Sequence, residues 1–130
     1  MRAIRPRLWY RRAMTIFAFD VDHTLEISDG PVPLAALAAL REQGHVVGLC
    51  GNWGFVVQRV TDWPSLVSFL GPIACTKVDQ LTELKKHVPA DDYVMVGNDP
   101  AVFGNSPDRE AAAEAGWRFL READFAAGVR

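Results

Sequence analysis

Two aspartates at the end of one apolar stretch are the residues of this sequence best placed to do chemistry. Asp20 and Asp22 follow residues 16–19, a short run of apolar, strand-favouring residues. Such a run is typical of a strand buried in a parallel sheet, and open parallel sheets carry their sites beyond the carboxyl ends of their strands. If the extended geometry continues, both carboxylates leave on the same side and repel each other. The pair then needs a cation or a protein ammonium nearby.

Three later stretches predict strands that also end in polar or glycine-rich residues. They are residues 45–50 followed by Gly51 and Asn52, residues 73–75 followed by Thr76 and Lys77, and residues 93–96 followed by Gly97, Asn98 and Asp99. Because the carboxyl ends of parallel strands meet at one edge of a sheet, we expect these residues to share one site.

Helical patterns separate the predicted strands. We expect helices at 34–43, 55–60, 64–70 and 79–87, another that opens at 106–107 and stops at Gly116, and an edge strand at 117–120. This alternation predicts an α/β fold, a three-layer Rossmann-like domain with a central parallel sheet and right-handed crossovers. We assign it to residues 14–130, after a basic extension at 1–13.

The chain is 130 residues long, with 49% hydrophobic and 23% charged residues, which suits one globular domain. Residues 1–13 contain five arginines and no acid, and the net charge of the whole chain is −2, so the remainder carries −7. An acidic body is a poor nucleic-acid binder, so we consider nucleic acid an unlikely partner. Two cysteines form no disulfide framework, and we find no secretory signal or membrane-length apolar stretch. These features predict a cytoplasmic protein.

The pattern Asp-x-Asp-x-Thr at 20–24, after an apolar strand, resembles the first motif of the haloacid dehalogenase (HAD) superfamily. The resemblance covers most of residues 14–120 and implies a HAD-like, magnesium-dependent phosphatase that acts on a phosphomonoester. It makes Asp20 the nucleophile that becomes an aspartyl phosphate and Asp22 the acid/base. It also gives Thr24 a place in the turn on the substrate side.

The other motifs match this family to different degrees. Lys77 resembles the lysine that stabilises the attacking carboxylate, and Asp99 resembles the acid that holds Mg²⁺ together with Asp20 and Asp22. Asn98 is retained as a second metal contact where the family commonly has aspartate. Asp108 resembles a later family acid, although an acid in a first helical turn also suits the helix dipole.

The second motif departs most from the family pattern. Gly51 stands where the family has a serine or threonine that binds phosphate, and the residue before it is Cys50. We expect the backbone amides of Gly51 and Asn52 to bind phosphate oxygens instead. Cys50 is more simply read as a small buried residue, and His23 as a residue that lines the site.

Residues 25–33 and 61–72 are too few for a folded cap domain, so we expect an open site. Capless relatives tend to act on large substrates or to borrow a neighbouring subunit as a lid. Two alternatives remain open. One is a catalytically weak phosphate- or metal-binding module, in which Gly51 and Asn98 mark decay. The other is a receiver-type signalling domain, which would need an aspartate on a later strand that neither 45–50 nor 73–75 provides.

Overall fold

The computed structural model describes residues 13–98 and 108–130 and contains one sheet with helices on both faces. The strands are β1 (Thr15–Phe19), β2 (Val46–Leu49), β3 (Asp92–Gly97) and β4 (Arg118–Arg121). All pair in parallel, in the order β2-β1-β3-β4. The α/β prediction and the edge strand near 117–120 are therefore confirmed.

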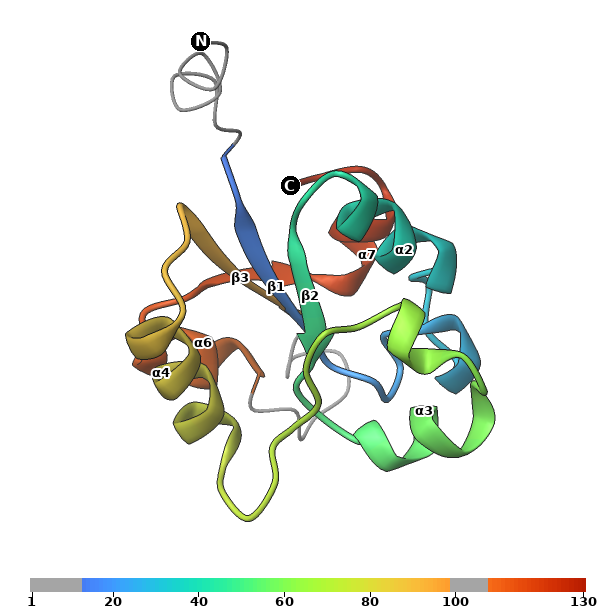
Figure 1. Cartoon of the computed structure of the whole chain (residues 1–130), viewed down its shortest axis with the longest axis horizontal. Helices are drawn as coiled ribbons and strands as arrows, with labels where there is room; N and C mark the ends of the chain where they lie inside the picture. Colours follow the sequence, from blue (N-terminus) through green and yellow to red (C-terminus); the bar gives the residue numbers. More distant parts are fainter. Residues whose placement is uncertain (1–12, 99–107) are drawn as a thin grey trace, which may run out of the picture.

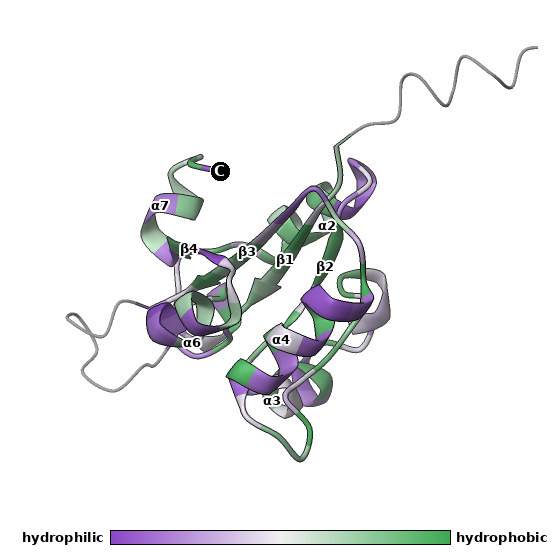
Figure 2. Ribbon diagram, turned by 90° about the vertical axis from the view of Figure 1, so that its left-hand side faces the viewer, coloured by the Kyte–Doolittle hydropathy of each residue, from purple (hydrophilic) through white to green (hydrophobic). Residues whose placement is uncertain are grey.

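The α-helices form two layers that are separated by the sheet (Figure 1). One layer holds α2 (Leu34–Glu42), α3 (Trp53–Arg59) and α7 (Glu122–Ala126), and the other holds α4 (Lys77–His87) and α6 (Asp108–Ala115). Short 3₁₀ turns, η1 (Glu26–Ser28) and η2 (Trp63–Ser65), lie in the connections. Strands β1 and β2 are mostly hydrophobic, whereas α4 and α6 also carry hydrophilic residues (Figure 2).

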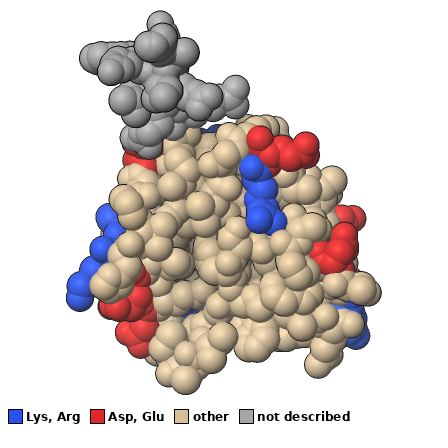
Figure 3. Space-filling view, in the orientation of Figure 1, with Lys and Arg blue, Asp and Glu red and all other residues tan. Residues whose placement is uncertain are grey.

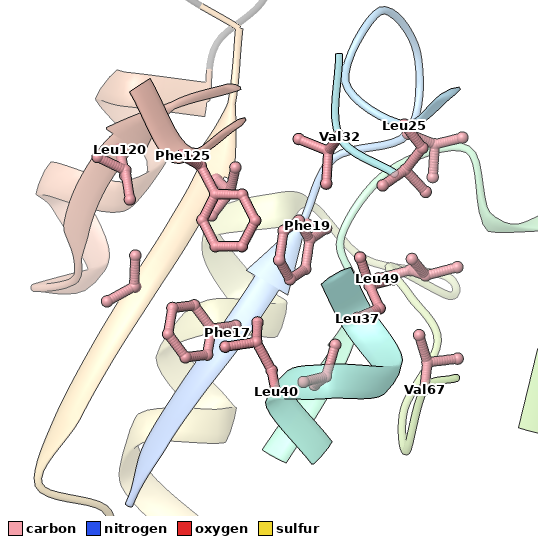
Figure 4. Close-up of a cluster of buried hydrophobic side chains, with 14 of the residues drawn as sticks. Phe17, Phe19, Leu25, Val32, Leu37, Leu40, Leu49, Val67, Leu120 and Phe125 are labelled. Carbon is pink, nitrogen blue, oxygen red and sulfur yellow. The ribbon is translucent and has the colours of Figure 1, made fainter. Parts of the chain in front are cut away.

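Side-chain alternation along β1 divides the core between the two layers. Phe17 and Phe19 face the layer of α2 and α7, where Phe19 packs edge-on against Phe125 with ring centroids 5.1 Å apart (Figure 4). Ile16 and Ala18 face the layer of α4 and α6. Asp20 continues the even-numbered series, so the strand directs its carboxylate toward α4 and α6.

The predicted strand at 73–75 is wrong. Ile73 is 61% exposed, and Ala74 has a left-handed φ of 57°. The backbone that runs beside β2 is instead that of residues 68–71. It makes Ser68 N–H to Val47 O, Leu49 N–H to Phe69 O and Gly51 N–H to Gly71 O hydrogen bonds. Pro72 follows and has no N–H to continue the ladder, so the chain leaves the sheet before residue 73.

Two predicted helices also differ from the structure. The segment 64–70 is helical only in η2, because its later residues run along β2. Helix α4 starts at Lys77 instead of residue 79, since Thr76 caps it and exchanges hydrogen bonds with Asp79 in a capping box. Helix α7 was not predicted. The predicted helix opening at 106–107 lies outside the described residues, but α6 ends before Gly116 as expected.

No folded cap is present in the described part of the chain. Residues 25–33 form η1 and an isolated bridge between Leu25 and Val32. The segment between α3 and α4 packs into the molecule, with Val67 buried in the core. The described residues also contain no helix long and apolar enough to cross a membrane.

Candidate active site

The crossovers of the sheet place Asp20 at the carboxyl edge between β1 and β3, where the connections leave toward opposite faces. The chain leaves β1 toward α2 on one face and leaves β3 toward α6 on the other face. A crevice opens at the carboxyl edge where neighbouring connections diverge in this way, and ligands bind there in open α/β sheets. Asp20 follows β1, and Asn98 follows β3, whose register sets Phe19 beside Val96. The sheet therefore brings residues 78 positions apart into one site.

Asp20, Lys77 and Asp108 form a buried charge cluster at this edge. Lys77 Nζ lies 3.0 Å from Asp20 Oδ1 and 2.6 Å from Asp108 Oδ1. Asp20 is 6% exposed and Asp108 is completely buried. Lys77 and Asp108 are the first residues of α4 and α6, so the positive ends of two helix dipoles also point toward the cluster. Lys77 and the two helix starts therefore place positive charge beside two carboxylates, and the cluster still has one carboxylate more than it has lysines.

Burial governs the protonation of this cluster. Burial, together with the charge of Asp108, raises the pKa of Asp20 to about 7, although Lys77 acts in the opposite direction. Burial alone would lower the pKa of Lys77, but the two carboxylates outweigh it, so the pKa of Lys77 is raised. Lys77 therefore remains charged at neutral pH, whereas the Asp20 carboxyl group titrates near neutral pH. A carboxylate that titrates near neutrality is typical of functional sites.

Gly97 allows Asp108 to approach the strand tip. A Cβ on residue 97 would lie 2.3 Å from Asp108 Oδ2, so a side chain there would push the carboxylate away. In the space left by glycine, Asp108 Oδ2 accepts a hydrogen bond of 3.1 Å from the backbone N–H of Asn98. Asp108 is thus a first-turn acid of α6 and also a direct partner of Lys77. The sequence alone leaves open whether Asp108 belongs to the site or only complements the dipole of α6.

Asp22 differs from Asp20 in its surroundings. The chain turns directly after Asp20, with Thr24 N–H bonded to Val21 O, so the two aspartates do not continue an extended strand. Asp22 is exposed, and Asn52 Nδ2 lies 3.3 Å from its Oδ1. The carboxylate that crowds Asp20 is that of Asp108, in place of the expected Asp22. Asp22 and Asn52 stand at the solvent side of the site.

Asn98 joins Asp20 to the turn that follows it. Its side-chain Nδ2 lies 3.2 Å from Asp20 Oδ2 and 2.7 Å from the main-chain oxygen of Asp22. Its Oδ1 is 3.5 Å from Thr24 Oγ1, a long contact. Thr24 is completely buried, so its hydroxyl lies beneath the turn, where it supports Asp22 and Asn98. His23 occupies this turn with a left-handed φ of 58° and is exposed.

Gly51 lies against the Asp20 carboxylate. A Cβ on residue 51 would lie 2.2 Å from Asp20 Oδ1, so this position of Asp20 requires glycine. The backbone N–H of Gly51 donates to Gly71 O, which corrects the expectation that this amide is available for a phosphate. Cys50 is buried, and burial raises the pKa of its thiol to about 12, in agreement with a packing role.

The oxygens near Asp20 are of the kind that Mg²⁺ prefers. Asp20 Oδ2 and the Asp22 main-chain oxygen converge on one point, and the Asn98 amide group reaches the same point. These residues therefore fit a magnesium ion if Asn98 presents its oxygen. Within residues 13–98 and 108–130, no group of three His, Cys, Asp or Glu side chains is arranged to hold a metal. Asp99, the predicted metal acid, lies outside the described residues.

Comparison with known proteins adds no assignment. No family model matches the chain, and neither a curated protein nor a solved structure matches it. The site therefore has to be understood from its own residues. Its centre is the buried Asp20 carboxylate, which has a pKa of about 7 and contacts Lys77 and the Asn98 amide, and Asp22 lies at its solvent side.

Proposed function

We propose that the chain is a HAD-like phosphomonoester hydrolase in which Asp20 is the nucleophile. The observation that carries the proposal is the position of Asp20 at the carboxyl edge between β1 and β3, with Lys77 Nζ 3.0 Å from its carboxylate. A carboxylate there meets an incoming phosphoryl group, and an ammonium beside it stabilises the charge of the transferring group. The two helix N-termini add to this stabilisation.

The chemistry divides between Asp20 and Asp22. A carboxylate oxygen of Asp20 forms a bond to phosphorus as the bond to the leaving oxygen breaks, and Asp22 donates a proton to that oxygen. Asp22 then takes a proton from the water that cleaves the aspartyl phosphate and releases inorganic phosphate. The exposure of Asp22 and its contact with Asn52 suit a group that exchanges protons with solvent and substrate.

Magnesium would be held by Asp20 Oδ2, the Asp22 main-chain oxygen and the Asn98 side chain, with Asp99 as a proposed further ligand. When bound, it supplies positive charge that screens the phosphate from the carboxylates. Lys77, already paired with two acids, cannot neutralise a phosphate dianion as well. The charge balance of the cluster therefore supports a need for an added cation.

The described residues contain no folded cap over Asp20, so the proposal includes a large phosphorylated substrate or a lid from a neighbouring subunit. On the face shown in Figure 3, acidic and basic side chains are interspersed instead of being grouped by sign. That face offers no basic track for nucleic acid. We therefore propose a phosphorylated protein or small molecule as the substrate. A cytoplasmic location remains part of the proposal.

A phosphate- or metal-binding module with little turnover is the second candidate. The specific observation in its favour is Gly51, which has no hydroxyl for phosphate and whose N–H is taken by Gly71 O. In this reading, Asp20, Lys77 and Asp108 bind ligands without completing the phosphoryl transfer. The receiver-type alternative has no support, because β2 ends at Leu49 and is followed by cysteine and glycine instead of an aspartate.

The test is hydrolysis of p-nitrophenyl phosphate and of an alkyl phosphate, with Mg²⁺ and with EDTA. We expect Mg²⁺-dependent turnover that Asp20→Asn abolishes, while the matched control Asp92→Asn, at the opposite end of the sheet, retains it. Asp22→Asn should slow the first step of the alkyl ester by about 10²–10⁴-fold, because the leaving oxygen lacks its proton donor. With the p-nitrophenyl ester the first burst of nitrophenolate should persist, since nitrophenolate leaves without a proton, and only the later hydrolysis of the aspartyl phosphate should slow. Wild-type protein that binds Mg²⁺ and phosphate by calorimetry but hydrolyses neither ester would favour the binding module.

A further inference from the structure

The side-chain amide of Asn98 lies where a cation would sit in this site. We propose that this amide is a built-in competitor for the metal, so that a divalent cation binds only when the Asn98 side chain turns away or reverses its amide. The inference rests on the proposed function only in assuming that the site takes a divalent cation, and it concerns what controls the affinity.

The contacts of Nδ2 reproduce those of a small cation. It lies 2.7 Å from the Asp22 main-chain oxygen and 3.2 Å from Asp20 Oδ2, and Asn98 is 3% exposed. An amide nitrogen has two hydrogens, one for each oxygen. The partial positive charge of the NH₂ group thus satisfies two converging acceptors. The nitrogen itself occupies the point between these two oxygens.

The orientation of the amide follows from its neighbours. If the amide were reversed, Oδ1 would face two acceptor oxygens with no hydrogen between them, which is repulsive in a buried site. The present orientation gives both oxygens a donor and leaves Oδ1 near the Thr24 hydroxyl, 3.5 Å away. A bound cation inverts this preference, because it attracts Oδ1. The amide orientation and the cation are therefore mutually exclusive in the form shown here.

The main chain of Asn98 cannot move aside easily. Its N–H donates to the buried Asp108 Oδ2, and Asp108 is held in turn by Lys77. Exchange between the two forms is thus confined to the side chain of Asn98. A carboxylate at this position would have no hydrogens to offer and would only attract the cation, which makes asparagine the affinity-lowering choice.

The sign of the Asn98→Ala effect tests the proposal. We expect the dissociation constants of Mg²⁺ and Mn²⁺, measured by calorimetry, to fall at least about tenfold in Asn98→Ala, because two competing hydrogen bonds are absent. The unfolding midpoint of this variant should be below that of wild type in EDTA, and Mg²⁺ should raise it more than it raises the wild-type midpoint. Asn98→Leu, which fills the space without donors or acceptors, should lose cation binding, and Asp92→Asn should leave it unchanged.

Weaker cation binding by Asn98→Ala than by wild type would overturn the proposal, since it would make Asn98 only a ligand. Cation binding by neither protein would overturn it too. If Asn98→Ala does not fold, the ¹H–¹⁵N signals of the Asn98 side-chain amide in wild type decide. We expect slow hydrogen exchange in EDTA and loss of protection with saturating Mg²⁺, whereas unchanged protection contradicts competition. Hydrolysis is a separate readout. If the wild type hydrolyses the esters but Asn98→Ala binds the cation more weakly, only this inference fails. If Asn98→Ala binds the cation more tightly but the wild type hydrolyses neither ester, only the proposed hydrolase fails.

Discussion

The two ends of the parallel sheet both pair acids with a base, but the pairs behave in opposite ways. At the carboxyl end, burial raises the pKa of Asp20 to about 7 although Lys77 is in contact with it. At the amino end, Arg118 donates hydrogen bonds to both oxygens of Asp92, and the pKa of Asp92 is lowered. The presence of a partner is common to both. The difference lies in burial and in the number of acids for each base.

The charge balance explains the contrast. Lys77 serves two carboxylates that are almost inaccessible to water, so the cluster contains one negative charge more than it can neutralise. Arg118 pairs with one carboxylate. The Arg118 side chain is 49% exposed and that of Asp92 is 39% exposed, so water screens the pair. A buried cluster with excess charge is unstable by itself and useful for chemistry. The exposed pair contributes only modestly to structure.

The largest change in the free energy of unfolding is expected from Lys77→Met, at the buried end of the sheet. It removes the cation that contacts both acids and leaves their charges buried together, so we expect a loss of about 3–5 kcal/mol in the free energy of unfolding at pH 8. Urea denaturation measures it. The loss should shrink at pH 5, which is below the raised pKa of Asp20, because that carboxyl group takes up a proton. An equal loss at both pH values would show that packing of the lysine stem, and not charge, is responsible.

The pH dependence of stability should differ in sign between the two ends. Because the pKa of Asp20 is about 7 in the folded protein and near 3.8 in the unfolded chain, its contribution is fully present below pH 3.8 and is lost as pH rises through 7. We expect the stability of wild type relative to Asp20→Asn to fall by about 2–4 kcal/mol between pH 4 and 8. Denaturant titrations at several pH values measure this slope.

Asp92 provides the reverse slope for the same experiment. Its folded pKa is lowered, so its contribution is present above the unfolded value and is lost as pH falls through the folded value. The difference between wild type and Asp92→Asn should therefore be constant at neutral pH and diminish in acid. Slopes of the same sign for both variants would contradict the contrast.

An intermediate effect is expected from a side chain at residue 51. Gly51→Ser introduces a hydroxyl, but its Cβ would lie 2.2 Å from Asp20 Oδ1 and force that carboxylate away from Lys77. We expect a loss of about 1–3 kcal/mol, measured by thermal unfolding. The control is Gly54→Ala in α3, where a Cβ meets nothing within 4 Å and should be neutral or slightly stabilising. A stable Gly51→Ser protein would mean that Asp20 tolerates another position.

The smallest effect is expected at the amino end. Arg118→Met removes the partner of Asp92 but leaves that carboxylate in water, so we expect a loss of about 0–1 kcal/mol. Denaturation at low and high salt measures it, and the loss should become smaller as salt screens the pair. A loss comparable with that of Lys77→Met would remove the distinction between the two ends.

Local sequence patterns were sufficient for the elements with a strong periodicity or an abrupt end. The apolar run before Asp20 identified β1, the spacing of Leu34, Leu37 and Leu40 identified α2, and Gly116 marked the end of α6. The start of α4 was also readable, because Thr76 and Asp79 have the spacing of a capping box. A capping box with Thr76 as the N-cap places Lys77 at the first position of the helix.

The strand predicted at 73–75 shows where local patterns fail. Its residues are apolar, but Gly48 leaves room for the Phe69 ring beside β2, where a Cβ would lie 2.3 Å from that ring. Residues 68–71 therefore take the position along β2, and Pro72 ends the pairing. Neighbouring segments compete for the same edge of a strand. Only the packed structure decides that competition.

The sequence by itself predicted which residues come together at one edge of the sheet: Asp20 and Asp22 after a buried strand, and Lys77 and Asn98 after later elements. It could not determine their environments. Burial, the pairing of Lys77 with Asp108 and the position of the Asn98 amide depend on strand order and on which helix starts face the crevice. Residue types fix what a group can do, whereas tertiary contacts fix its charge and its reach. Two aspartates two positions apart thus became one buried and one exposed carboxylate.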